Sequence, residues 1–135
     1  DNEPGHHYAY LYNYCNRLDK TQSRLRTILK DNYKNAPDGL SGNDDCGQMS
    51  AWYLFSALGF YPVTPASGMY ALGIPHFEEI RLQLPNKRVL KIRAKGLESY
   101  HTLDDVCLNG KALDSPFVKI SDLLEGGVLE FCPKR

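Results

Sequence analysis

The chain has no excess of charge of either sign, because 16 Lys and Arg residues balance 16 Asp and Glu residues. Proteins that bind nucleic acids or anionic membranes depend on a basic face, and this composition does not indicate one. Its apolar runs are also far shorter than the ~20 residues that span a bilayer. We therefore expect neither a nucleic acid nor a membrane among its partners.

Closely spaced cysteines are absent as well: none of the four cysteines belongs to a Cys-x-x-Cys pair. Zinc ribbons and thioredoxin-like sites need that spacing, so neither is indicated. Cys107 and Cys132 lie in strand-like segments and could pair in an oxidising compartment. Free thiols in the core are the alternative.

The length of 135 residues suits one ordinary domain. The first residues, Asp1-Asn2-Glu3-Pro4, are typical of the interior of a longer protein. We therefore expect a fragment or a processed chain.

Three helices are predicted in the first 60 residues. The first covers 6–17, and the second begins with Asp19 as N-cap and Gln22 at the matching position of a capping box. The third should cover 45–58 and end at Gly59. Apolar residues surround nearly all of this third helix, which is typical of a helix buried on every side. Partner helices are therefore expected outside the chain.

From residue 69 onward, apolar and polar residues alternate with a period of two, which indicates strands with one face in solvent. The segments 80–84 and 90–94 are predicted to form a hairpin through the turn 85–87. Further strands are expected around 106–108, 117–120 and 128–132, with one helical turn at 121–124.

These patterns predict an α+β chain whose helices precede antiparallel strands of a sandwich-like segment. The expected division is a helical part at 1–61, a linker at 62–68 and a β part at 69–135.

Adjacent carboxylates stand where a polar loop meets the third helix. Residues 42–52 read Gly-Asn-Asp-Asp-Cys-Gly-Gln-Met-Ser-Ala-Trp. Asp45 could cap the helix, hold a cation, or accept a proton from water as a general base. The positive end of the helix dipole would keep it ionised in each case. Asp44 is expected to be a solvated loop carboxylate, with support of Asp45 as the alternative.

A second polar group opens the chain. Asn2 and Glu3 offer an amide oxygen and a carboxylate, which suit a hard cation such as calcium, although Asn-Glu-Pro is also an ordinary helix entry. His6 and His7 are adjacent and lack the i, i+4 spacing of a helical zinc site. Trp52 could stack on a sugar ring, and core packing is the alternative.

Several motifs together resemble one enzyme family, glycoside hydrolase family 92. They are Asn-Glu-Pro-Gly-His-His at 2–7, the segment 42–63 that contains both carboxylates, and Tyr-Ala-Leu-Gly-Ile-Pro at 70–75. The resemblance implies a calcium-dependent, inverting exo-α-mannosidase that acts on mannose-containing glycans and is periplasmic or secreted. It also implies that residues 1–61 are the last helices of an (α/α)6 barrel, in a longer protein with an N-terminal sandwich domain.

The resemblance also implies roles for individual residues. Asp45 matches the general base, and Asn2 with Glu3 matches the segment that helps to hold calcium. Asn43 stands where many members carry a second acidic residue, so it and Asp44 are candidates for support.

Three more residues are candidates to line the substrate site: His6, His7 and Trp52. The family's general acid is a glutamate upstream of the Asn-Glu-Pro segment, so we expect it outside this chain and expect the chain alone to be inactive. A non-catalytic carbohydrate-binding or structural module is the alternative function.

Overall fold

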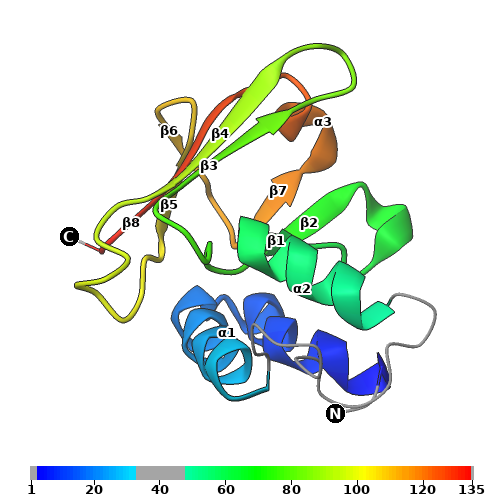
Figure 1. Cartoon of the computed structure of the whole chain (residues 1–135), viewed down its shortest axis with the longest axis vertical. Coiled ribbons are helices and arrows are strands. Elements are labelled where there is room, and N and C mark those ends of the chain that lie inside the picture. The colour runs from blue at the N-terminus through cyan, green and yellow to red at the C-terminus, as the bar shows by residue number, and fades with distance from the viewer. Residues whose placement is uncertain (1–2, 33–47, 135) are drawn as a thin grey trace.

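The computed structural model describes residues 3–32 and 48–134 of the chain. Its helical part consists of the 3-10 helix η1 (Glu3–Cys15) and the α-helices α1 (Leu18–Asn32) and α2 (Gln48–Leu58). Figure 1 shows these helices grouped on one side of the molecule and the strands on the other. The predicted α+β class is confirmed.

A small antiparallel sheet lies against the helices. It has the order β1-β2-β7, with β1 (Phe60–Tyr61), β2 (Met69–Leu72) and β7 (Phe117–Lys119). Both η1 and α2 contact this sheet, η1 through β2 and α2 through β1. The sheet therefore joins the helices to the rest of the β part.

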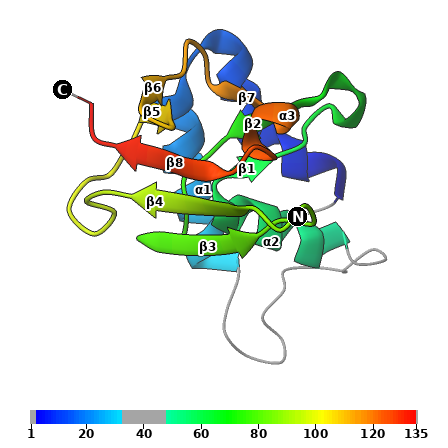
Figure 2. The same ribbon diagram turned by 90° about the horizontal axis from the view of Figure 1, so that it is seen from above.

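The larger sheet has five strands in the order β3-β4-β8-β5-β6. They are β3 (Glu79–Gln83), β4 (Val89–Ala94), β5 (Asp105–Leu108), β6 (Lys111–Ala112) and β8 (Gly127–Cys132). Figure 2 shows β3, β4 and β8 lying alongside one another. The prediction of a purely antiparallel arrangement is wrong for one pair, because β4 and β8 are parallel. Parallel neighbours need a long crossover, and residues 95–126 provide it.

The local hairpins agree with the sequence pattern. Ile80 pairs with Ile92 and Leu82 with Leu90, as the alternation predicts. The connection from β5 to β6 has φ values of 53° at Asn109 and 83° at Gly110, the positive pair that a tight two-residue hairpin turn requires. The expected helical turn near residue 121 is α3 (Ile120–Leu123).

The first two helices depart from the prediction. The first is a 3-10 helix, in which the buried residues Tyr10 and Asn13 are three apart and so share one face. The second begins at Leu18, so Asp19 lies in its first turn, and Gln22 points inward instead of completing a capping box. The third ends at Leu58 as predicted, and Leu54 on it is 61% exposed in this chain, so burial on every side with partner helices from outside the chain stays a prediction.

One hydrophobic core extends through the helices and both sheets. Its largest fully buried members are Tyr10, Leu25, Trp52, Leu72, Ile74, Leu90, Ile92, Leu103, Leu129 and Phe131. The stretch 62–68, predicted as a linker, contains the short 3-10 helix η2 (Pro65–Ser67), and β1 before it pairs with β2 after it. The domain boundaries at 61 and 69 stay a prediction.

Two buried side-chain amides connect the helices to the β part. Asn13 on η1 donates to the carbonyl oxygens of Leu72 (2.8 Å) and Pro116 (2.9 Å) and accepts from Thr21 Oγ1 (2.5 Å).

Gln22 on α1 donates to the carbonyl oxygens of Gly73 (2.9 Å) and Leu103 (2.8 Å). Its Oε1 accepts from the backbone N–H of Leu103 (2.6 Å). Both amides are buried, with Asn13 2% and Gln22 0% exposed. Each amide therefore supplies hydrogen bonds, which water would otherwise supply, to backbone groups in or next to the strands.

None of the helices within the described ranges combines the length and the apolar character needed to cross a lipid bilayer.

We predict that Gln22→Ala lowers the free energy of unfolding by roughly 2–4 kcal/mol, because it leaves buried backbone groups of Gly73 and Leu103 without partners. Urea denaturation followed by circular dichroism measures the change. Gln83→Ala is the matched control, since Gln83 is exposed on β3, and it should change stability by less than about 0.5 kcal/mol. Equal effects of the two substitutions would contradict the role given to Gln22.

Candidate active site

The predicted site residues divide into those outside and those inside the described ranges. Asn2, Asn43, Asp44 and Asp45 lie outside them. Glu3, His6 and His7 belong to the first part of η1, and Trp52 lies on α2. The structure therefore informs on the site through two helices, η1 and α2.

The helices η1 and α2 lie side by side and run in the same general direction. The dark-blue start of η1 and the start of α2 point to the same side of the molecule in both views (Figures 1 and 2). Tyr10 Oη on η1 and Ser56 Oγ on α2 form a hydrogen bond of 2.7 Å. The starts of the two helices, which contain Glu3 and follow the Asn-Asp-Asp segment in the sequence, thus lie on the same side of the molecule.

Helix starts favour anionic groups. The first N–H groups of an α-helix have no partner within the helix, and the helix dipole adds partial positive charge there. A carboxylate near the start of α2 would therefore be kept ionised, as a proton acceptor must be.

Trp52 is part of the core. Its side chain is 1% exposed and belongs to the cluster that also contains Tyr10 and Leu72. The described residues leave no open face of this ring for a sugar, and its assignment to substrate binding stays a prediction.

The sequence did not reveal Tyr10 and Ser56 as the contact between the two helices. Tyr10 lies in a segment with tyrosines at every second position, and neighbouring Tyr8 and Tyr12 are 66% and 41% exposed. A hydroxyl in an otherwise apolar stretch of α2 is the only sequence signal for Ser56.

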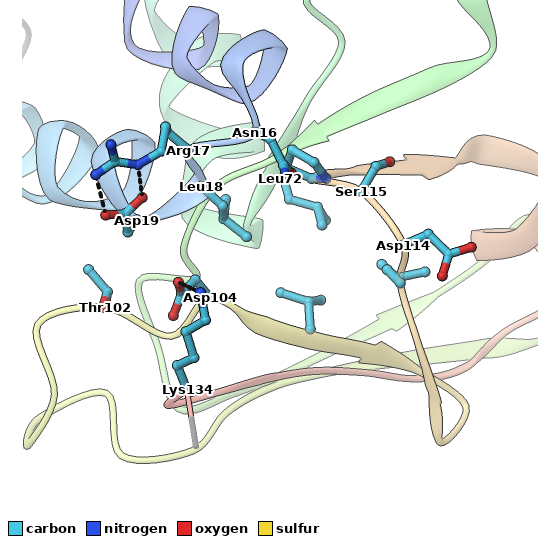
Figure 3. Close-up of a pocket in the computed structure, with 13 residues that line it drawn as sticks. Asn16, Arg17, Leu18, Asp19, Leu72, Thr102, Asp104, Asp114, Ser115 and Lys134 are labelled. Atoms are coloured by element: carbon cyan, nitrogen blue, oxygen red, sulfur yellow. Dashed lines mark hydrogen bonds and ion pairs between the residues drawn. The ribbon is translucent and has the colours of Figure 1, made fainter.

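The cavity in Figure 3 lies elsewhere, between the start of α1 and the segments before β5 and β7. Its volume is about 520 Å³, and two pairs of oppositely charged side chains line it. Arg17 donates to both carboxylate oxygens of Asp19 at 3.0 Å, a hydrogen bond that lowers the pKa of Asp19. Lys134 Nζ lies 3.9 Å from a carboxylate oxygen of Asp104.

This cavity is separated from the predicted active site by the length of η1. Asn16 and Arg17 in its wall follow the last residue of η1. The 13 residues of the helix correspond to about 26 Å at ~2.0 Å per residue. The cavity therefore lies far from the start of η1.

The thiols do not form a reactive site in the described part of the chain. Cys15, Cys107 and Cys132 are free, so the disulfide that Cys107 and Cys132 could have formed is not present. Burial, and then the negative charge of Glu130, raises the pKa of the Cys132 thiol. A protonated thiol is a poor nucleophile and a poor metal ligand.

Within residues 3–32 and 48–134, no group of three or more His, Cys, Asp and Glu side chains could hold a metal ion.

Comparison with known protein families shows which family this chain belongs to. The family model described as glycosyl hydrolase family 92 catalytic domain matches residues 1–132. The chain belongs to glycoside hydrolase family 92. Its α+β fold and its motifs are thus those of a glycoside hydrolase family.

Solved structures of family 92 enzymes from Bacteroides thetaiotaomicron superpose well on this chain. One is an alpha-mannosidase in complex with mannoimidazole, with 42% identity and a TM-score of 0.87, covering 97% of this chain and 17% of its own. Another is described as an inverting mannosidase, with 35% identity and a TM-score of 0.84, covering 96% of this chain and 18% of its own.

A relative from Arthroderma benhamiae is described as an uncharacterized secreted glycosidase. It is 27% identical over 133 residues, which are 96% of this chain and 17% of the relative. The chain thus spans less than a fifth of the length of each of these proteins.

Proposed function

We propose that the protein carrying this chain is a calcium-dependent, inverting exo-α-mannosidase that removes terminal α-mannosyl residues from glycans. Membership of family 92 supports the reaction class. The observation in the structure that supports it is the common side on which η1 and α2 begin, since these helices follow the two segments with candidate catalytic groups.

Asp45 is the general base in this proposal. It lies three residues before Gln48, the first residue of α2, where the helix dipole favours its ionised form. An ionised carboxylate can take a proton from a water molecule as that water attacks the anomeric carbon. Asn43 and Asp44 would hold the carboxylate or the water in place.

Inversion needs a second carboxyl group on the other side of the sugar, about 6.5–9.5 Å from the base. The second group protonates the leaving oxygen. We propose that a glutamate in another part of the longer protein provides it, and that the 135-residue chain alone is therefore inactive.

Asn2 and Glu3 would hold calcium in this proposal. Their donor atoms, an amide oxygen and a carboxylate, are the kinds that calcium prefers, so the donor set fits the ion. When bound, calcium would supply positive charge that orients sugar hydroxyls. His6 and His7 would line or support the site from η1, and Trp52 would support it from the core.

A secreted or periplasmic location is part of the proposal. The relative described as a secreted glycosidase supports it. Mannose-containing glycans and the remainder of the polypeptide are then the partners of this chain.

Asp45→Asn distinguishes catalysis from helix capping. Asparagine caps a helix about as well as aspartate but cannot serve as the base, so we predict that kcat of the full-length protein on an α-mannobioside falls roughly 10²–10⁴-fold. Steady-state kinetics and thermal denaturation measure both effects. Asp122→Asn is the control, because Asp122 is an exposed carboxylate in the first turn of α3, and it should leave kcat unchanged.

If Asp45→Asn kept a near-normal kcat, the base assignment would be wrong. Mannoside binding without hydrolysis by the unaltered protein would favour the non-catalytic carbohydrate-binding module instead.

Calcium removal tests the cofactor. We predict that dialysis against a chelator abolishes hydrolysis, that added calcium restores it, and that Glu3→Gln weakens calcium binding because one anionic ligand is lost. Calorimetric titration with calcium and metal analysis of the purified protein measure these effects. Full activity in protein shown to contain no calcium would contradict the proposed cofactor.

A further inference from the structure

The helices η1 and α2 are each fixed to the β part near their C-terminal ends. Asn13, close to the end of η1, bonds to the carbonyl oxygens of Leu72 and Pro116. At the end of α2, the Ala57 carbonyl accepts from the His76 N–H (2.9 Å), and the Gly59 carbonyl accepts from the Gly73 N–H (2.8 Å). The starts of both helices lie farther from these attachments.

The Tyr10–Ser56 hydrogen bond joins the two helices between these attachments and their starts. Both residues are 0% exposed, and their oxygens are 2.7 Å apart. The Tyr10 ring is also confined: it stacks on Tyr61 with ring centroids 5.1 Å apart. The Gly73 backbone also approaches the ring closely: a Cβ atom added to Gly73 would lie only 3.3 Å from the Tyr10 ring. This side chain has little freedom to adjust if the hydrogen bond is lost.

Burial also fixes the chemical state of Tyr10. It raises the pKa of the phenol above its ordinary value, so the group stays a neutral hydroxyl at physiological pH. The contact between the helices is thus a hydrogen bond between two uncharged hydroxyl groups, without dependence on pH or salt.

The bond lies at similar distances from the two helix starts. Glu3 is seven residues before Tyr10, about 14 Å at ~2.0 Å per residue of 3-10 helix. Gln48 is eight residues before Ser56, about 12 Å at ~1.5 Å per residue of α-helix. Because the helices run in the same general direction, a slip at Tyr10–Ser56 would displace one start relative to the other.

We propose that Tyr10 and Ser56 are positioning residues that set the register of η1 against α2. They would thereby set the distance between Glu3, at the start of η1, and Gln48, at the start of α2, the helix that follows the segment with the proposed base. This inference rests on the proposed function. Neither hydroxyl would touch the substrate, since both are fully buried.

A loss of register should lower the rate more than it lowers stability. A displacement of about 1 Å in a catalytic group can cost ~10²-fold in rate. We therefore expect Tyr10→Phe, which removes one hydroxyl and keeps the ring, to lower kcat roughly 10- to 100-fold and to weaken calcium binding several-fold.

The test uses the full-length protein and four variants: Tyr10→Phe, Ser56→Ala, the double variant and Tyr14→Phe. The matched control is Tyr14→Phe, because Tyr14 lies on the same helix and its hydroxyl bonds to Thr64 Oγ1 (3.1 Å) at an exposed position. The measurements are kcat, KM and the calcium dissociation constant, at a temperature where circular dichroism shows every variant folded. Thermal denaturation is measured separately.

We expect both single variants to lose kcat and calcium affinity and the double variant to lose no more than the larger single loss, because one bond is removed in each case. Tyr14→Phe should match the unaltered protein. If Tyr10→Phe and Ser56→Ala lowered only the melting temperature, with kcat and calcium affinity within twofold of the unaltered protein, the positioning role would be refuted.

Failure of the proposed function has a different signature. An unaltered protein without mannosidase activity, or an active Asp45→Asn variant, would refute the proposed function whatever Tyr10→Phe did. Activity that depends on Asp45 but not on Tyr10 or Ser56 would refute the positioning role alone.

Discussion

The buried amides of Asn13 and Gln22 hold the helices and the strands of this chain together. Asn13 bonds to carbonyl groups 59 and 103 residues away in the sequence, and Gln22 bonds to carbonyl groups 51 and 81 residues away. Apolar contacts alone would let the helices slide over the sheets, because such contacts have no direction. Hydrogen bonds to fixed carbonyl groups allow one position and make any other position costly.

Asn13 fixes the end of η1 to the β part, and backbone hydrogen bonds of Ala57 and Gly59 do the same at the end of α2. Both helices begin on the same side of the molecule. A single carboxylate cannot complete an inverting hydrolysis, since the leaving oxygen needs a proton from the opposite side. The function proposed for this chain is therefore one part of an active site that the longer protein completes.

The sequence predicted the local features well and the non-local ones poorly. The β3–β4 hairpin and the Asn109-Gly110 turn follow from alternation and turn chemistry within a dozen residues. The parallel pairing of β4 with β8 depends on a crossover of residues 95–126 and has no local signal. Gln22 matched a capping box by spacing alone, yet backbone groups of Gly73 and Leu103 compete for the same amide and hold it.

In the candidate site, the motif containing Asp45 could be recognised from residue types and order, whereas the Tyr10–Ser56 contact joins residues 46 apart and emerges only from the packing of the helices.

The stereochemistry of the released sugar tests the central claim most directly. Proton NMR of the full-length protein with an α-mannobioside, recorded before the product anomers equilibrate, identifies the first anomer formed. A water molecule activated by a base on the face opposite the leaving group must release β-mannose. First release of α-mannose would mean a retaining reaction through a covalent intermediate, and it would contradict the role of Asp45 as a general base.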